Sequence, residues 1–243
     1  MSATINILPL PNLETPDVCR LHPNIPQGSC LIVAPSNSGK TTLIVNLLLR
    51  QVFGVLVHYK HIYIFSPTCR SDASWDMVQP EHYHPFRMKC PDGKRRLTAE
   101  IHLHDTFDQA RIARIMKDQE EVPRPERDNV LLIIDDFASE FKDTVTMSRL
   151  VMRGRHSKVW VWISTQLYRK IPRSIRVNMP YYIFFLVNTN ELKTISEELA
   201  TGSISAFEAL FRRCTEAAFS FFCINAKLPV AQRYFCNFKK IES

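Results

Sequence analysis

The 243-residue sequence lacks features of membrane and secreted proteins. Its longer apolar stretches, such as residues 181–187, are far shorter than the roughly 20 residues of a membrane-spanning helix. Residues 1–6 contain neither a basic region nor a long apolar segment, so we expect no secretory signal. The seven cysteines include no Cys-x-x-Cys pair, which predicts buried, reduced thiols in an intracellular protein.

Acidic residues are also missing from one long span. No Asp or Glu occurs between Thr144 and Asn190, whereas eight Lys and Arg do, which exceeds the net charge of +7 of the whole chain. A basic block on an otherwise balanced chain indicates a polyanionic partner, either nucleic acid or nucleotide phosphates. A solvated basic surface is the alternative, and charge by itself does not separate the two.

Alternating apolar and helical patterns predict an α/β fold with a mostly parallel central sheet and helices on both faces. Residues 1–28 are Pro-rich and are expected to form an extended arm. Residues 29–243 are expected to form one domain with an irregular insertion at 68–105. A Pro-Asp-Gly turn signal within it, at residues 91–93, predicts a hairpin between 86–90 and 95–104. Other expected strands cover 29–34, 61–67, 129–137, 158–164, 181–187, 219–225 and 233–238, and expected helices cover 42–51, 106–121, 143–153, 191–201 and 205–215.

Residues 34–41, Ala-Pro-Ser-Asn-Ser-Gly-Lys-Thr, match a phosphate-binding loop between a strand and a helix, with Ala34 at the usual place of the first Gly. Backbone N–H groups at the helix start would face the phosphates. Lys40 would reach the β- and γ-phosphates of ATP, and the Thr41 hydroxyl would hold Mg²⁺. The expected nucleotide contacts are Ala34, Pro35, Ser36, Asn37, Ser38, Gly39, Lys40, Thr41 and Thr42.

Two carboxylates follow the apolar strand expected at 129–137. In phosphate-loop NTPases an Asp at this position anchors Mg²⁺, a role expected for Asp135. Asp136 would orient or deprotonate the attacking water, although many such enzymes have the longer Glu there. Gln166 ends the next strand and is the candidate sensor of the γ-phosphate, with Thr165 second. Arg153 and Arg155 are candidates for an arginine that completes a neighbouring subunit's site, and we expect them near the ATP site.

Two further interpretations of the sequence receive less support. Cys69, His82, His84, Cys90, His102 and His104 could supply zinc ligands, but their spacing matches no common template, so we expect no zinc site. The aromatic residues Phe184, Phe185, Phe219, Phe221 and Phe222 are expected in the core rather than as a platform for stacking bases.

The spaced motifs at 34–41, 131–136, 153–156, 164–166 and 171–178 together resemble viral genome-packaging ATPases of the FtsK/HerA superfamily. The similarity covers roughly residues 25–225. It implies a RecA/FtsK-like P-loop NTPase fold and an ATPase that pumps double-stranded DNA into a capsid. It also implies a ring-shaped homo-oligomer, pentameric or hexameric, with ATP between subunits and an arginine acting in trans. The partners would be the DNA and a capsid or portal-like vertex, in the host cytoplasm or nucleus or with the virion.

Two basic clusters are the candidate DNA contacts. One surrounds the expected turn and contains Lys94, Arg95 and Arg96, and the other follows the sensor strand and contains Arg169, Lys170 and Arg173. Contacts to phosphates carry no sequence information, which suits a motor that moves any DNA. Two other functions stay open: a P-loop phosphotransferase acting on a nucleoside or another small molecule, and an ATP-gated capsid assembly factor with little hydrolysis.

Overall fold

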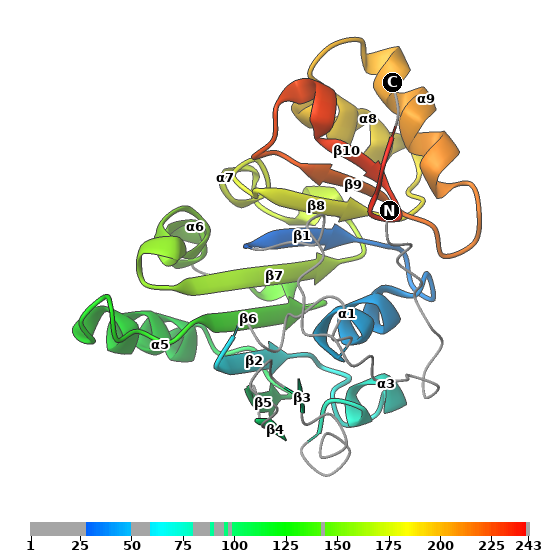
Figure 1. Ribbon diagram of the computed structural model, residues 1–243. Helices are drawn as coiled ribbons and strands as arrows, with labels where there is room; N and C mark the ends of the chain where they lie inside the picture. The colour runs from blue at the N-terminus through cyan, green and yellow to red at the C-terminus, as the bar shows by residue number, and fades with distance from the viewer. Residues whose placement is uncertain are drawn as a thin grey trace.

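The chain folds around one nine-stranded sheet with the order β11-β10-β9-β8-β1-β7-β6-β2-β5 (Figure 1). The computed structural model describes residues 28–49, 59–79, 88–89, 95–96, 99–141 and 144–241. The expected arm at 1–28 therefore lies almost wholly outside the described residues.

Six neighbouring strands of the sheet are parallel, and the strands at one end are antiparallel. The parallel strands are β1 (Cys30–Val33), β2 (His61–Phe65), β5 (Glu100–His104), β6 (Val130–Asp135), β7 (Val159–Thr165) and β8 (Tyr181–Phe184). The antiparallel strands are β9 (Phe222–Asn225), β10 (Tyr234–Cys236) and β11 (Lys239–Lys240). All carboxyl ends of the parallel strands therefore meet at one edge of the sheet, where α/β proteins bind ligands.

Helices cover both faces of the sheet, as expected. On one face lie α1 (Lys40–Leu49) and α3 (Ala73–Asp76), and on the other lie α5 (Gln109–Glu121), α6 (Thr144–Arg153), α7 (Arg173–Arg176), α8 (Thr189–Leu199) and α9 (Ile204–Thr215). Alternate residues of each central strand enter the two cores, for example Leu131 on one side and Leu132 on the other. This two-sided burial explains why the strands are continuous apolar runs.

Polar side chains fix where several helices begin. The helix expected from residue 106 starts at Gln109 because Asp108 caps it, accepting hydrogen bonds from the N–H groups of Ala110 and Arg111. The Asn188 side chain caps α8 in the same way. In the part of the chain that the structure describes, no helix is long and apolar enough to cross a bilayer.

The expected hairpin is shorter than the sequence suggested. β3 (Met88–Lys89) pairs antiparallel with β4 (Arg95–Arg96), but residues 100–104 of the expected second arm form a separate strand. This strand, β5, joins the main sheet parallel to β2. Its apolar residues Ile101 and Leu103 pack against the core on the α1 side, and this packing is a tertiary contact that a local turn signal does not reveal.

The thiols agree with the expectation of reduced cysteines. Among the described residues, Cys30, Cys69, Cys214 and Cys223 are buried and free, and Cys236 is free and half-buried. Burial raises the pKa of the Cys30 and Cys223 thiols, so both stay protonated and unreactive. These cysteines therefore act as small apolar core residues.

Candidate nucleotide site

The loop between β1 and α1 lies at the carboxyl edge of the parallel strands, after the central strand of the nine-stranded sheet. Asn37 and Gly39 have left-handed backbones, with φ values of 60° and 88°. The Ser38 hydroxyl donates to the Pro35 carbonyl at 2.8 Å, and the Leu43 N–H donates to the Gly39 carbonyl at 2.8 Å to begin the helix. The loop thus turns sharply and delivers the first turn of α1, whose N–H groups have no partner within the helix, to the sheet edge.

Ala34 replaces the usual first Gly without disturbing the loop. Its N–H donates to the Thr165 carbonyl at 3.0 Å, which extends the pairing of β1 with β7 by one residue. Its methyl group is fully buried in the core on the α1 side. The Ala34 backbone is not left-handed, so this position makes no demand that only glycine could meet.

Lys40 lies between the two carboxylates that end β6. Its Nζ is 2.6 Å from Asp136 Oδ1 and 3.5 Å from Asp135 Oδ1. The side chains of Lys40 and Asp135 are 9% and 3% exposed, whereas that of Asp136 is 32% exposed. The structure therefore brings together one buried carboxylate, one accessible carboxylate and a buried ammonium.

Two hydroxyl groups hold the buried carboxylate from neighbouring strands. Ser164 on β7 donates to Asp135 Oδ1, and Ser66, directly after β2, donates to Asp135 Oδ2 at 3.0 Å. We predicted no role for Ser66 from the sequence. It lies at the end of the strand expected at 61–67, so the rule that carboxyl ends share an edge was the signal that could have found it.

Asp136 and Gln166 meet at the open side of the site. Asp136 has a left-handed backbone, with φ of 56°, and its N–H donates to the Ser164 carbonyl at 3.1 Å. Gln166 Nε2 donates to Asp136 Oδ2 at 3.4 Å. Strained residues of this kind cluster at functional sites. The Thr165 hydroxyl instead bonds within its own turn, to the backbone of Leu167.

We expected Arg153 and Arg155 to lie near the ATP site. This expectation is wrong for the ATP site of their own chain, from which both residues are distant. Arg153 ends α6, and Arg155 belongs to the 3₁₀ turn Gly154–His156 that precedes β7. Both are therefore at the amino edge, and the seven residues of β7 separate them from the phosphate loop by about 20 Å. Gly154 fits the tight turn because a Cβ there would collide with the Val159 carbonyl.

The span without acids in the sequence is partly neutralised in space. Arg169 pairs with Glu191 of α8 at 3.0 Å, and the mostly buried Arg176 pairs with Glu198 at 2.6 Å. Arg173 is 75% exposed and lies 3.5 Å from Glu198. Lys170 is exposed. Of the other expected DNA contacts, Lys94 lies outside the described residues, as do the side chains of Arg95 and Arg96.

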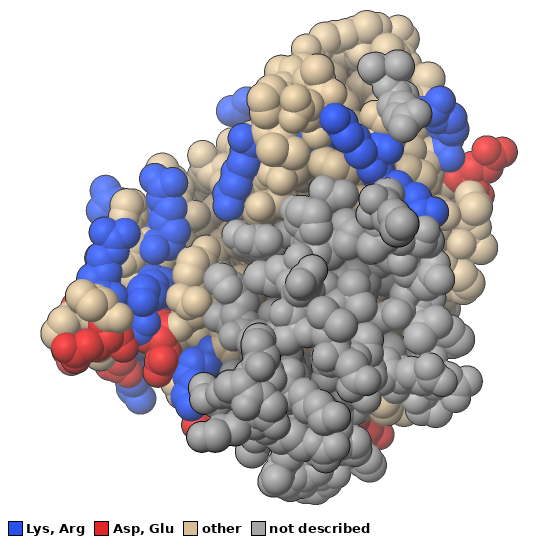
Figure 2. Space-filling view, viewed as in Figure 1, with Lys and Arg blue, Asp and Glu red and all other residues tan. Residues whose placement is uncertain are grey.

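Figure 2 shows where the remaining charge gathers on one face of the molecule. Lys and Arg side chains cluster over the α6 end, at the left, and Asp and Glu side chains lie below them over α5. Arg149 of α6 and Glu120 of α5 pair across this boundary at 3.6 Å. The exposed arginines of the amino edge therefore adjoin an acidic strip.

The expectation that the late aromatic residues are all core is wrong at one position. Phe184, Phe185, Phe221 and Phe222 are at most 3% exposed, but Phe219 is 69% exposed. It lies in the turn before β9, which begins three residues later than the strand expected from residue 219. Gly39 lies beside it, so this ring borders the phosphate loop.

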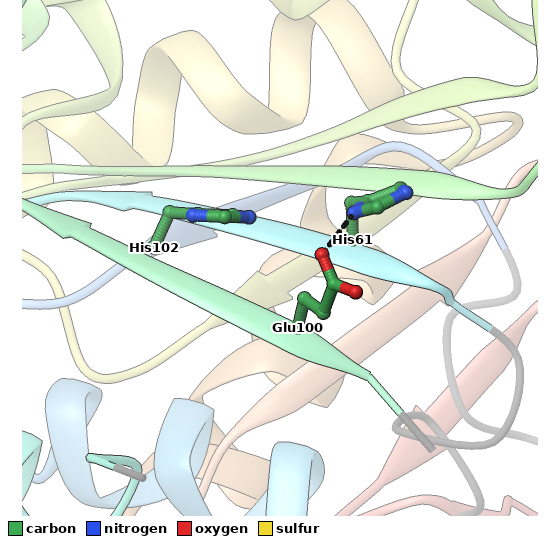
Figure 3. A group of neighbouring side chains, drawn as sticks. All are labelled: His61, Glu100 and His102. Atoms are coloured by element: carbon green, nitrogen blue, oxygen red, sulfur yellow. Dashed lines mark ion pairs between the residues drawn. The ribbon is translucent and has the colours of Figure 1, made fainter. Parts of the chain in front are cut away.

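Among the candidate zinc ligands, His102 belongs to a group that the sequence did not reveal (Figure 3). His61 Nδ1 lies 3.2 Å from Glu100 Oε2, and ligand atoms of His61, Glu100 and His102 lie within 4.8 Å of one another. The chemistry of this set could hold a divalent ion. Cys69 is not part of the group, and His82, His84 and Cys90 lie outside the described residues. The group is on the β2–β5 side, away from the phosphate loop.

The parallel sheet, the phosphate loop and the carboxylates beside Lys40 define a P-loop NTPase. Solved structures share this fold. The genome packaging NTPase B204 from Sulfolobus turreted icosahedral virus 2 with AMP is 15% identical, has a TM-score of 0.55, and matches over 82% of this chain and 93% of that chain. B204, the DNA-packaging ATPase from Sulfolobus turreted icosahedral virus, is 17% identical, has a TM-score of 0.55, and matches over 83% and 94%.

The particular family follows from the sequence match. The model of the family described as Poxvirus A32 protein matches residues 28–212, and the chain belongs to this family. No curated protein matches the chain. Family membership thus agrees with the resemblance to viral packaging ATPases that the motifs indicated.

Proposed function

We propose that this chain is an ATP-hydrolysing DNA translocase that packages double-stranded DNA into a viral capsid. The observation that carries the proposal is the position of Lys40, between Asp135 and Asp136 at the helix start that follows the phosphate loop. The family membership and the fold shared with packaging NTPases support it. Such work places the protein inside the host cell, in the cytoplasm or nucleus, or with the virion.

The chain's donor set fits ATP with Mg²⁺. Thr41 follows Lys40 in the first turn of α1, and Asp135 is held by Ser66 and Ser164 while its Oδ2 keeps a further lone pair. Thr41 and Asp135 would hold Mg²⁺, which supplies positive charge at the β- and γ-phosphate oxygens when bound. B204 has been solved with ATP-gammaS and with AMPPCP, which is consistent with nucleotide binding by this fold.

Asp136 and Gln166 would act on the attacking water. The phosphates of ATP compete with Asp136 for the Lys40 ammonium, and this competition frees the more exposed carboxylate to orient and accept a proton from water. Gln166 directly follows β7 and is hydrogen-bonded to Asp136, so its side chain would contact the γ-phosphate and move when this phosphate is lost. The shorter side chain of Asp136, compared with Glu, places this water closer to β6.

The arginines support a shared site. Because Arg153 and Arg155 lie at the amino edge, either one could serve only the site of another subunit. A closed ring of five or six copies that joins the carboxyl edge of one subunit to the amino edge of the next would satisfy this condition. Lys170 and Arg173 would contribute contacts to DNA phosphates, whereas the Glu191 pair neutralises much of the charge of Arg169.

The test is the ATPase rate as a function of protein concentration, with and without long duplex DNA. We expect stimulation by DNA and a steep concentration dependence. Lys40→Ala should abolish hydrolysis while the circular dichroism spectrum stays unchanged, and the exposed Lys117→Ala serves as the matched control. Normal turnover of Lys40→Ala would contradict the assignment. If the protein instead turns over ATP as a monomer and needs a small acceptor, it is a kinase. If it does not turn over ATP under any condition, it is an assembly factor.

A further inference from the structure

Phe219 combines exposure with backbone strain. It lies in a turn closed by a hydrogen bond from the Ser220 N–H to the Ala217 carbonyl, at 3.1 Å. The residue is 69% exposed and its φ is 63°. A bulky residue rarely adopts this strained backbone, and an exposed ring forgoes the free energy of burial. Such a combination points to a ligand that the ring contacts.

The ring lies directly against the phosphate loop. A Cβ placed on Gly39 would be 3.2 Å from Phe219 Cδ1 and 3.9 Å from Cε1. Gly39 therefore has two reasons to be glycine, since its φ is 88° and the Phe219 ring occupies the space that a side chain would need. A molecule bound to the loop would be within reach of this ring.

The two sides of the loop differ in chemistry. In the strand order β9-β8-β1-β7-β6, the carboxylates lie on the β7–β6 side of the loop, and Phe219 leads into β9 on the other side. Leu186, which is 54% exposed, follows β8 at the same edge. A nucleotide has this polarity, with a charged triphosphate at one end and a flat, largely apolar base at the other.

We infer that Phe219 is the platform on which the nucleobase of the bound nucleoside triphosphate stacks, with Leu186 contributing apolar surface nearby. This inference rests on the proposed function, because it requires nucleotide binding at the loop. Base–aromatic stacking contributes about 1–3 kcal/mol per base and tolerates different bases, since every base has a π face. Stacking on one ring thus selects for a large base and distinguishes poorly between adenine and guanine.

The experiment compares binding of ATP with binding of inorganic tripolyphosphate by calorimetry. Phe219→Gly removes the ring and suits the left-handed backbone, so its melting temperature should equal or exceed that of the wild type. We expect its affinity for ATP to fall about 5- to 150-fold. Its affinity for tripolyphosphate should stay unchanged, and Phe219→Trp should keep full affinity for ATP. Ile204→Ala, an exposed apolar residue at the start of α9, is the control.

The outcomes separate the platform from the proposed function. Lys40→Ala should weaken both ligands, because it acts on the phosphates. If Phe219→Gly binds ATP as the wild type does while Lys40→Ala does not, the platform is wrong and the nucleotide site stands. If Phe219→Gly keeps ATP affinity but loses self-association in sedimentation, the ring is a subunit contact and the inference falls. If the wild type binds neither ligand, both proposals fail.

Discussion

The two edges of the central sheet have opposite chemistry. At the carboxyl edge lie the phosphate loop, the carboxylates Asp135 and Asp136, and the exposed ring of Phe219. At the amino edge lie Arg153 and Arg155, joined by Lys227 on the turn that follows β9. Burial, and then repulsion by Arg155, lowers the pKa of Lys227, which places this ammonium in the same basic region.

This difference indicates that one chain carries parts of two nucleotide sites. Its carboxyl edge forms part of its own site, and its amino edge could complete the site of another subunit. Parallel strands all point one way, so groups before a strand and groups after it are held apart by the length of that strand. Residues that are close in sequence, such as Arg155 and Gln166, are therefore on opposite edges. If the proposed ring forms, each interface joins the carboxylates of one subunit's carboxyl edge to the arginines of the next subunit's amino edge.

The largest expected effect comes from the amino edge. An arginine that acts on a neighbour's ATP contributes about 10³–10⁵ in rate, so either Arg153→Ala or Arg155→Ala should lose turnover on this scale. ATP affinity should persist, because the chain's own loop is intact. Steady-state ATPase assays at saturating ATP measure the effect, with Arg149→Ala of the same helix as the control. Full activity in both variants, and in the double variant, would remove the arginines from the mechanism.

The next effect belongs to the carboxyl edge. Asp136→Asn should reduce turnover about 10²–10⁴-fold, as expected for loss of a general base, while ATP affinity is retained or increased because one negative charge is removed. The exposed Asp118→Asn is the matched control. Mixing Asp136→Asn subunits with the inactive arginine variant should restore part of the activity, because some interfaces then contain both intact edges. No recovery on mixing would argue against shared sites.

A smaller effect should follow from loss of a hydroxyl behind the carboxylates. Ser66→Ala removes a hydrogen bond to the buried Asp135 and should lower the free energy of unfolding by about 1.5–3 kcal/mol. Urea unfolding measures this change. The exposed Ser71, whose hydroxyl donates to the carbonyl of Thr68, gives the control variant Ser71→Ala. Equal stability of the two variants would mean that Asp135 does not need this donor.

The smallest effect is expected at His102 of β5, away from the carboxylates and the arginines discussed above. Burial lowers the pKa of His102 below its usual 6.5, with a further contribution from His61. The unfolded chain then binds more protons, so stability is complete above about pH 6.5 and falls as the pH drops through that value toward the folded-state pKa. His102→Phe keeps a ring against Tyr63 and should flatten the decline in melting temperature between about pH 7.5 and 5.5. An unchanged slope, matching that of exposed His156→Gln, would contradict this origin.

Most elements of the fold could be predicted from local patterns. The runs that became β1, β6 and β7 are apolar and bounded by polar residues, so their type and approximate bounds follow from burial on both faces. β5 was misassigned because its partner, β2, lies far away in sequence and only the turn signal was local. Helix starts were displaced by capping side chains, as at Asp108.

Some features of the candidate site could likewise be predicted from local sequence, and others could not. The phosphate loop and the paired aspartates lie in short continuous motifs, so the sequence alone predicts that they are neighbours. Glu191 and Glu198 could not be predicted, because they approach Arg169 and Arg176 only through packing of distant elements. Ser66 was overlooked, although the rule that parallel strands end at one edge could have placed it near Asp135. Charge counted along the chain also overstated the basic surface, since part of it is paired in space.

By itself, the sequence determined the α/β class, the loop at residues 34–41 and the two carboxylates after β6. These depend on hydrophobic periodicity and on residues within a few positions of one another. Only the tertiary structure decided that Arg153 and Arg155 lie at the edge opposite the loop and that Phe219 is exposed beside Gly39. The physical reason is that strand direction, strand order and backbone conformation at a turn set these positions, and all three depend on packing between distant segments.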